Sequence, residues 1–321
     1  MRAIRVDANG GPEVLRPVEV DVGDPGPGEV RVRLAAAGVN FIDVYQRRGL
    51  YPVPTPFVLG LEGAGTVEAV GPEVTLFGVG DVVAWAHTLG SYAEQAIVPE
   101  HALVRVPDAV PARTAAALML QGMTAHYLAR STFALEPGHV ALVHAGAGGV
   151  GLLLTQLAKR QGATVLTTVS SEEKAALSSA AGADAVIRYD QADVAEAVRE
   201  HVPEGMHVVY DSVGRDTFDT SLSCLRPRGY MVLFGQSSGA PDPVDPQRLN
   251  SGGSLFLTRP SLGHHIADRD ELEWRAGELF ALVAEGALEV RIGETHPLED
   301  AETAHRRLEG RETTGKVLLE P

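Results

Sequence analysis

The sequence predicts an α/β protein that combines a doubly wound parallel sheet with a compact, partly open β-barrel. Residues 1 to about 121 hold short alternating runs punctuated by glycine and proline, which is typical of a small barrel. From about residue 122 to 260, strand-like and helix-like segments alternate, which indicates a parallel sheet with helices on both faces. Residues 261–321 are too few for a domain of their own, so we expect them to return to the barrel.

Strands are expected wherever short apolar or alternating runs stand between turn residues. In the barrel these runs span residues 30–40, 63–71, 79–86 and 92–99. In the parallel sheet they span residues 140–143, 164–169, 184–189, 207–214, 230–235 and 254–260. An amphipathic helix over 272–283 and a closing strand over 315–321 complete the pattern.

The stretch after the first strand of the parallel sheet has the pattern of a dinucleotide-binding loop. Gly146, Gly148 and Gly151 stand in G-x-G-x-x-G spacing, and apolar residues at helical spacing follow up to Gly162. In such a loop the first glycine allows a tight turn, the second lets a pyrophosphate approach the backbone, and the third lets helix and strand pack closely. The β-branched run 164–169 supplies a second strand, so the segment predicts a β-α-β unit that binds a dinucleotide.

The end of that second strand predicts which dinucleotide is bound. A site for NAD normally has Asp or Glu about 20 residues beyond the glycines, where the carboxylate accepts hydrogen bonds from the ribose. This chain has Ser170 and Ser171 there, with Lys174 shortly after. Small hydroxyl residues and a lysine accept a 2′-phosphate that a carboxylate would repel. Glu172 and Glu173 are expected in the first turn of the next helix, an ordinary place for acidic residues, so the sequence predicts NADP(H).

Composition and charge disfavour several classes of partner. The chain has 27 basic and 42 acidic residues and a formal net charge of -15, which argues against nucleic acid and anionic membranes. No run of 18 or more apolar residues occurs, and the first residues lead into a strand pattern instead of a signal peptide. We therefore expect a cytoplasmic protein that acts on small molecules.

The cysteine and histidine content predicts no metal site. The single cysteine, Cys224, rules out an intramolecular disulfide and a four-cysteine zinc site, and we expect it to pack as a small hydrophobic residue on a helix before a strand. Among the eleven histidines only His264 and His265 are adjacent, and neighbours along a chain rarely bind one ion.

Five blocks of the sequence resemble the medium-chain dehydrogenase/reductase superfamily, and within it the zinc-free quinone oxidoreductases related to zeta-crystallin. These blocks are AAGVNFIDVYQRRGLYP, HAGAGGVG, VVYDSVGRDT, LFGQSSGAP and TRPSL, and the resemblance runs from end to end. It implies a GroES-like catalytic domain formed by residues 1–121 with 261–321, a Rossmann domain formed by residues 122–260, and a homodimer. It also implies hydride transfer from NADPH to a quinone without a metal.

The resemblance assigns residues to the cofactor. The adenosine 2′-phosphate would be held by Ser170, Lys174 and Tyr189, in agreement with the missing acid, although half-buried packing is the alternative role for Tyr189. Other nucleotide contacts are expected at Asn40, Phe41, Ile42, Val44, Tyr45, Thr124, Gly146, Gly148, Gly149, Val150, Ser212, Gly235, Gln236, Ser237 and Arg311.

This chain departs from the common pattern of that superfamily at a few positions. Ser170 stands where relatives often have glycine, so its side chain could add a hydrogen bond or crowd the phosphate. Gln121 stands where a lysine is common, so one positive charge is missing. Asn40 and Asp43 lie near the first ligand position of zinc-dependent members and residues 60–65 near the second, so no thiolate site can form there.

The absence of a Lewis acid limits the chemistry that we expect. Alcohol oxidation needs a group that stabilises the developing alkoxide, whereas a quinone takes hydride directly from a nicotinamide that the protein orients and shields from water. We expect Asn40, Tyr45 and Tyr51 at the reacting centre, with Tyr51 as a proton or hydrogen-bond donor; alternatively, Tyr51 packs on the barrel surface beside Pro52. An enoyl or other α,β-unsaturated carbonyl reductase is the alternative enzyme, and a nucleotide-binding protein without catalysis is the alternative outside enzymes.

The segment 254–260 predicts how two copies associate. It supplies the sixth strand, which lies at the edge of a doubly wound sheet. Residues 254–257 contain no charge that would guard this edge, and an unprotected apolar edge invites strand pairing. A two-fold axis would then join two sheets into one homodimer. A loop that covers the edge is the alternative.

Overall fold

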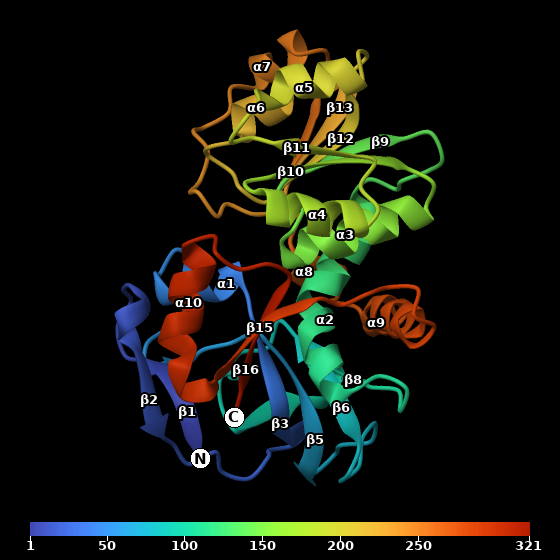
Figure 1. Ribbon diagram of the computed structural model, residues 1–321. Coiled ribbons are helices and arrows are strands. Elements are labelled where there is room, and N and C mark those ends of the chain that lie inside the picture. The colour runs from blue at the N-terminus through green and yellow to red at the C-terminus, as the bar shows by residue number, and fades with distance from the viewer. The chain divides into compact units, whose positions relative to one another are not determined.

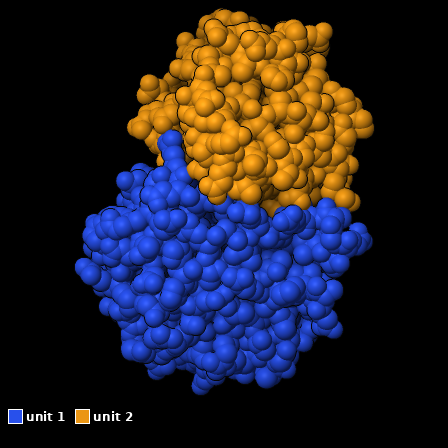
Figure 2. Space-filling view, in the orientation of Figure 1, with its two compact units in different colours: residues 1–123, 265–321 blue, residues 124–264 orange.

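Helix α2 (Ala112–Tyr127) takes the chain from one folding unit into a second, and helix α8 (Leu262–His265) takes it back. The computed structural model describes residues 1–321; unit 1 contains residues 1–123 and 265–321, and unit 2 contains residues 124–264 (Figure 2). Unit 2 begins inside α2 and ends within α8. The expected divisions, at residues 121 and 260, lie a few residues earlier.

Unit 2 is built on a six-stranded parallel sheet (Figure 1). Its strands are β9 (Val140–Val143), β10 (Thr164–Val169), β11 (Ala185–Arg188), β12 (Met206–Asp211), β13 (Leu225–Leu233) and β14 (Phe256–Thr258). Their order is β11-β10-β9-β12-β13-β14, with every neighbouring pair parallel. This is the doubly wound order, so the predicted fold class of this half is confirmed.

Helices bury both faces of this sheet. Helices α3 (Gly149–Arg160) and α4 (Glu172–Ala180) cover one face, while α5 (Val194–His201) and α6 (Phe218–Ser223) cover the other (Figure 1). The strands are aliphatic because both of their faces are removed from water. Cys224 ends α6 and is buried, which raises the pKa of its thiol to about 11, as suits a packing residue.

The edge strand β14 is shorter than the expected run 254–260. Gly253 and Ser254 adopt left-handed backbone conformations with φ of 109° and 58°, so the chain turns there, and pairing with β13 begins at Phe256. Helix α7 (Pro246–Ser251) precedes this turn. Phe256 is 48% exposed and its ring stacks on Tyr230, with centroids 4.4 Å apart.

Unit 1 is organised around the long strand β3 (Glu29–Val39). It pairs with β5 (Glu62–Val70) along one edge and with β7 (Gln95–Pro99) and β16 (Lys316–Glu320) along the other. Two register irregularities in the β3–β5 pairing let this sheet bend. The main sheet also contains β6 (Val82–Ala86), β8 (Leu103–Arg105) and β15 (Ile292–Pro297). A smaller sheet contains β1 (Arg2–Val6), β2 (Leu15–Glu19) and β4 (Phe57–Val58).

The last part of the chain, residues 265–321, belongs to unit 1. Helices α9 (Arg269–Ala284) and α10 (Ala301–Glu309) lie in this segment, and β16 then pairs with β3 so that Leu319 is opposite Ala37. The seven-residue helix α1 (Phe41–Arg47) follows β3 directly. Single 3-10 turns span residues 12–14, 100–102 and 298–300, and a π-helical turn spans 128–132. None of the helices combines the length and the apolar character that a membrane span requires.

Candidate active site

The predicted dinucleotide loop lies between β9 and α3, and the fold itself requires its three glycines to different degrees. A Cβ at Gly151 would lie 3.0 Å from the Cα of Gly146 and even closer to the carbonyl oxygen of Ala145. A Cβ at Gly146 would lie 2.6 Å from the Cβ of Thr167. At Gly148 the nearest atom would be 3.2 Å away. Gly148 is therefore the glycine whose missing side chain the fold needs least, which fits a position kept bare for a phosphate.

Helix α3 starts in a way that suits an anion. Its N-cap is Gly148, no side chain caps it, and its first turn has no acidic residue. The N–H groups of a first helical turn lack partners within the helix, and the helix dipole adds partial positive charge at that end. The loop therefore has the chemistry of a pyrophosphate site.

A buried hydrogen-bonded network joins the carboxyl ends of three neighbouring strands. His144 follows β9, and its Nδ1 lies 2.9 Å from Thr168 Oγ1 on β10. Its Nε2 lies 3.0 Å from Ser221 Oγ, which donates a 2.7 Å hydrogen bond to Asp211 Oδ2 at the end of β12. Burial lowers the pKa of His144, so the ring bridges the strands in its neutral form at pH 7.

Asp211 also shapes the loop after β12. Its Oδ1 accepts hydrogen bonds of 2.7 and 2.9 Å from the backbone N–H groups of residues 213 and 214. The loop packs on predicted nucleotide contacts that follow β13: the Ser237 N–H donates to the Ser212 carbonyl oxygen at 3.1 Å, and a Cβ at Gly235 would lie 2.6 Å from that oxygen. The structure therefore brings Ser212, Gly235 and Ser237 together, with Gln236 between them.

The three residues predicted to bind the 2′-phosphate meet at the same edge of the sheet. Ser170 follows β10, and its Oγ accepts a 3.4 Å hydrogen bond from Lys174 Nζ. Tyr189 follows β11, and its N–H donates to the Val169 carbonyl oxygen at 3.2 Å, which places it next to Ser170. The Tyr189 side chain is 45% exposed. The Ser170 hydroxyl and the Lys174 ammonium therefore lie together, and the Tyr189 backbone lies at the end of the neighbouring strand.

The acidic residues beside this cluster are held by other groups. Ser171 caps α4, and Glu172 begins that helix, as expected from the sequence. One carboxylate oxygen of Glu172 lies 2.9 Å from Arg188 Nη1, and the same guanidinium pairs with Asp190 at 2.7 Å. The ion pair with Arg188 reduces the negative field of Glu172 beside Ser170.

Asn40, which the sequence places at the reacting centre, is buried with its side chain fully bonded to protein groups. Its Oδ1 accepts hydrogen bonds from Lys316 Nζ at 2.8 Å and Gln121 Nε2 at 3.2 Å. Its Nδ2 donates to Glu62 Oε2 at 2.8 Å and to the Gly38 carbonyl oxygen at 3.2 Å. An amide has two donors and two lone pairs, and these four bonds use them all. This favours a supporting role for Asn40 over direct contact with a substrate.

The other residues predicted on α1 form an aromatic group with Tyr51. The rings of Tyr45 and Tyr51 meet edge to face with centroids 5.2 Å apart, and the Phe41 ring lies 6.2 Å from that of Tyr45. The Tyr51 N–H donates to the Tyr45 carbonyl oxygen at 3.2 Å. Tyr45 and Val44 are buried, whereas Phe41, Ile42 and Tyr51 are half-buried. Tyr51 therefore packs on α1 through Tyr45, and its role at the reacting centre stays a prediction.

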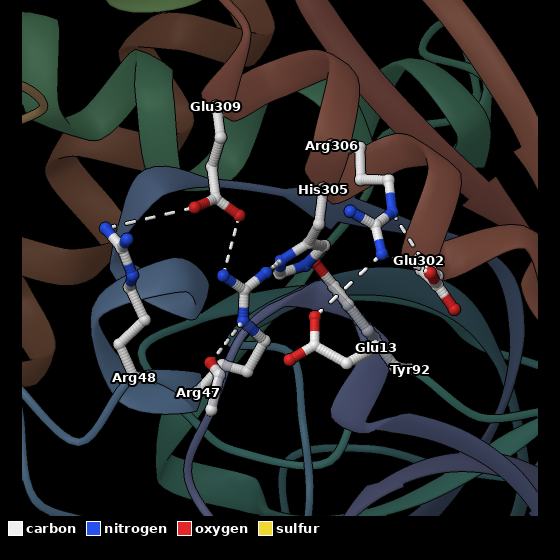
Figure 3. Close-up of polar contacts among 9 residues, drawn as sticks. Glu13, Arg47, Arg48, Tyr92, Glu302, His305, Arg306 and Glu309 are labelled. Carbon is white, nitrogen blue, oxygen red and sulfur yellow. Dashed lines mark hydrogen bonds and ion pairs between the residues drawn. The ribbon is translucent and has the colours of Figure 1, made fainter.

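A series of hydrogen bonds links α1 to α10 inside unit 1 through Asp43, Tyr92, His305 and Arg47. Figure 3 shows the last three of these residues. Asp43 Oδ2 accepts from the Tyr92 hydroxyl at 3.0 Å and from the Asn40 N–H at 2.8 Å. The Tyr92 oxygen lies 3.1 Å from His305 Nε2, and His305 Nδ1 lies 2.9 Å from Arg47 Nη1. Burial raises the pKa of Asp43 to about 7, and burial with the nearby Arg47 charge lowers the pKa of His305 to about 3.

Two further predicted contacts, Thr124 and Arg311, lie on or just after helices. Thr124 lies on α2 and is 7% exposed. Arg311 follows α10, is exposed, and adopts a left-handed conformation with φ of 58°. No group of three or more His, Cys, Asp or Glu side chains is placed to hold a metal ion. Glu62, in the segment near the second zinc-ligand position, forms an ion pair with Lys316 instead.

Sequence reasoning missed the residues that support these groups, above all Glu62, Lys316, Arg47 and His305. Lys316 and Asn40 are 276 positions apart, so no local pattern links them. One signal was present: Lys316 begins an apolar closing strand, and a charge in such a strand needs a buried partner.

Family models match both parts of the chain. The model described as "Alcohol dehydrogenase GroES-like domain" matches residues 26–108, and the model described as "Zinc-binding dehydrogenase" matches residues 149–275. A quinone oxidoreductase of Pseudomonas aeruginosa is 47% identical over 100% of this chain and 99% of its own length. A 2-haloacrylate reductase of a Burkholderia species is 43% identical over 98% of each chain.

Solved structures of similar proteins also superpose on the whole chain. The crystal structure of Escherichia coli quinone oxidoreductase complexed with NADPH superposes with a TM-score of 0.98, at 44% identity and 100% coverage of both chains. A mycobacterial protein complexed with NADPH superposes with a TM-score of 0.97, at 50% identity and 100% coverage of both chains.

Proposed function

The chain belongs to the quinone oxidoreductase branch of the medium-chain dehydrogenase/reductase superfamily, and from this premise we propose that it transfers hydride from NADPH to a quinone. With one proton from solvent or from the protein, the products are NADP⁺ and a hydroquinone. The cluster of Ser170, Lys174 and Tyr189 at the carboxyl edge of β10 and β11 is the observation that carries the choice of cofactor.

Each part of the proposed site has one physical task. The glycine loop and the start of α3 bind the pyrophosphate, and Lys174 with the two hydroxyls binds the 2′-phosphate. NADPH, when bound, supplies the hydride. Tyr45 and Tyr51 limit the access of water and offer a hydroxyl to the acceptor oxygen. The neutral His144 bridge keeps the strand ends in place without adding charge.

The direct test is an assay of NADPH absorbance with a panel of quinones. The proposal expects NADPH consumption that depends on both the enzyme and the quinone, with much lower rates when NADH replaces NADPH. NADPH binding without consumption by any quinone or enone would instead support a nucleotide-binding protein without catalysis.

We also propose that the reaction needs no metal. The chain has one cysteine, and its buried acid Glu62 is paired with Lys316. A quinone is electron-poor enough to accept hydride without a Lewis acid. Full quinone reduction after exhaustive chelation, with no stoichiometric zinc in elemental analysis, is the expected result. A bound zinc whose removal stops turnover would contradict the proposal.

A reductase for α,β-unsaturated carbonyl compounds is the second candidate, and the identity to 2-haloacrylate reductase favours it. Such a reaction requires an acid that protonates the α-carbon, whereas a hydroquinone anion takes a proton from water. Tyr51→Phe should therefore abolish reduction of enones and only slow the reduction of quinones. Equal losses with both acceptors would argue that Tyr51 has no acid role.

We further propose a homodimer joined through β14. This strand has a partner on one side only, and Phe256 at the edge is 48% exposed. Pairing of two β14 strands about a two-fold axis would cover that residue. Sedimentation should show a dimer that Phe256→Lys weakens; a monomer at micromolar concentration, or a dimer indifferent to this change, would contradict the interface. A cytoplasmic location stays a prediction, which cell fractionation would test.

A further inference from the structure

Helix α1 is too short to be stable without outside support. It has seven residues, whereas an isolated helix needs about 12–15. Yet it carries four of the predicted cofactor contacts. The fully buried lysine and arginine residues of the chain are Arg47, Arg275 and Lys316, and two of these three bind the ends of α1.

The first anchor holds the start of α1. Lys316 Nζ donates to Asn40 Oδ1 at 2.8 Å and forms an ion pair with Glu62, both of whose carboxylate oxygens are engaged. Glu62 Oε2 accepts from Asn40 Nδ2 at 2.8 Å, and Oε1 accepts from the Leu120 N–H at 2.7 Å. A side chain at Gly38 would collide with both Glu62 and Lys316, so the bare backbone there makes room for the pair. These bonds fix the amide that precedes the helix.

The second anchor holds the end of α1 (Figure 3). Arg47 is the last residue of the helix and is 0% exposed. Its Nη2 lies 2.6 Å from Glu309 Oε1, its Nη1 lies 2.9 Å from His305 Nδ1, and its Nε donates to the Gly10 carbonyl oxygen at 3.2 Å. Both His305 and Glu309 belong to α10. The guanidinium fork therefore fastens α1 to the last helix of the chain.

The hydrogens of this second anchor run in one direction only. A guanidinium only donates, so Arg47 donates to His305 Nδ1, and the neutral ring carries its own proton on Nε2. That proton is donated to Tyr92, whose hydroxyl donates to Asp43 on α1. Arg47 cannot release a proton at any ordinary pH, so this series of hydrogen bonds cannot carry a proton from the surface to the helix. The hydrogen bonds instead hold α1 in place as a brace.

We propose that Lys316 and Arg47 are positioning residues, through which residues 298–320 hold both ends of α1 and so keep its reacting groups in register for hydride transfer. The proposal rests on the proposed function, because α1 carries the predicted contacts to the reacting centre. Hydride transfer is sensitive to such register, since a displacement of about 1 Å can lower a rate about 100-fold.

The experiment removes the first anchor without stranding a charge. Lys316→Met alone would leave Glu62 buried and unpaired, so the test variant is the double substitution Glu62→Gln with Lys316→Met, which is neutral. The matched control is Arg275→Met, which removes the third buried cation from the same unit. Arg275 binds the His265 carbonyl oxygen and Glu271, and neither lies on α1.

Three quantities are measured on each folded variant: hydrogen exchange of the amides of residues 41–47 without cofactor, the dissociation constant for NADPH, and kcat with a quinone. In the double variant we expect exchange at least about tenfold faster in 41–47 and kcat lower by at least about tenfold. The dissociation constant for NADPH should rise by a smaller factor than that by which kcat falls, because the glycine loop and the Ser170 cluster, which would bind the phosphates, lie outside α1. In Arg275→Met, exchange in 41–47 and kcat should match the wild type.

Hydrogen exchange at the wild-type rate in residues 41–47 of the double variant would overturn the proposal. An equally large increase of that rate in Arg275→Met would also overturn it, because it would indicate general loosening of the unit. Lys316→Arg keeps the charge and should restore most of the exchange protection and of kcat. If the double variant does not fold, Arg47→Gln takes its place with the same expected results, because its partner Glu309 is 20% exposed and stays solvated. If the wild type reduces no quinone, the proposed function fails, while exchange in 41–47 still decides whether the brace exists.

Discussion

Two regions differ in how their residues are placed along the chain. One is the nucleotide edge of unit 2, which comprises the glycine loop and the cluster of Ser170, Lys174 and Tyr189. The other is the brace of α1 in unit 1, which comprises the two anchors made by Lys316 and Arg47 with their partners. The nucleotide edge takes its glycine loop and its phosphate cluster from residues 144–189, in the loops that follow strands and in the first turns of the helices after them. The brace joins residues separated by 258 and 276 positions. The predicted ligand-binding residues follow a local sequence pattern. The residues that support other side chains lie far apart in the sequence and meet only in the folded protein.

The two regions also differ in burial. Tyr189 at the nucleotide edge is 45% exposed, whereas Asn40 is 4% exposed and its amide is fully bonded within the protein. A side chain that binds a ligand must keep hydrogen-bonding capacity available, and a supporting side chain must use its own. The comparison therefore separates the residues that should change affinity from those that should change stability.

The largest expected effect is a difference in stability between substitutions at two lysines, one from each region. Lys316→Met leaves the Glu62 carboxylate buried without its ion-pair partner, and we expect a loss of about 3–5 kcal/mol in the free energy of unfolding. Lys174→Ala removes a charge from the nucleotide edge, and the unfolding free energy should change by no more than about 0.5 kcal/mol. Urea unfolding of the two variants gives both values. Similar losses for both would show that the regions do not differ in this way.

A smaller effect separates two glycines of the same loop. Gly151→Ala places a Cβ against the backbone of Ala145 and Gly146, so overpacking should cost about 1–3 kcal/mol of stability. At Gly148 the nearest atom would be 3.2 Å away, so Gly148→Ala should cost less stability than Gly151→Ala and should weaken NADPH binding. Thermal unfolding and a fluorescence titration with NADPH measure the two effects. A destabilised Gly148→Ala variant with native affinity would reverse the assignment of these glycines.

A third effect is a pH dependence of stability in which Asp43 and His305 act in opposite directions, so that it is small in the wild type. The pKa of His305 falls from 6.5 to about 3 on folding, so the unfolded chain binds the extra proton and stability is lost as pH falls below about 6.5. The pKa of Asp43 rises from 3.8 to about 7, so the folded chain binds the extra proton and stability is gained as pH falls below about 7. Between about pH 6.5 and 4 the two contributions offset each other.

Single substitutions should uncover each contribution. Relative to the wild type, His305→Gln should gain stability as pH falls from 7.5 to about 5, because only the Asp43 contribution remains. Asp43→Asn should lose stability over the same range, because only the His305 contribution remains. The other groups that contact this series of hydrogen bonds stay unchanged in both variants; they are Arg47, Tyr92 and Glu309. Parallel pH dependence in all three proteins would contradict the assigned pKa shifts.

The strands expected from the sequence are found with most of their ends within a few residues, whereas β2, β4, β8 and β15 of unit 1 were not predicted. The alternation of strand and helix in unit 2 yields the observed strand order, because short right-handed connections leave few ways to arrange six parallel strands. The edge strand is shorter than expected because Gly253 and Ser254 turn the chain. In the candidate site, the glycine loop and the pair of Ser170 and Lys174 are predictable, since both depend on spacing within one β-α-β unit.

The support of the site is not predictable in the same way. Asn40 is conspicuous in the sequence as a polar residue after a strand, but its role depends on Lys316 and Glu62, which only the folded barrel brings together. His144 is likewise prominent before the glycine loop, yet its partner Ser221 is 77 positions away. Contacts of this kind follow from packing, which local patterns do not encode.

The central claim, that the nucleotide edge selects NADPH for quinone reduction, is tested most directly by the ratio of kcat/KM for NADPH to that for NADH with one quinone. The account predicts a ratio well above one in the wild type. Lys174→Ala should lower this ratio by about 10- to 100-fold, because one charge-assisted contact of about 1.5–3 kcal/mol is lost with NADPH and none with NADH. A ratio near one in the wild type, or equal losses with both nucleotides in the variant, would contradict the account.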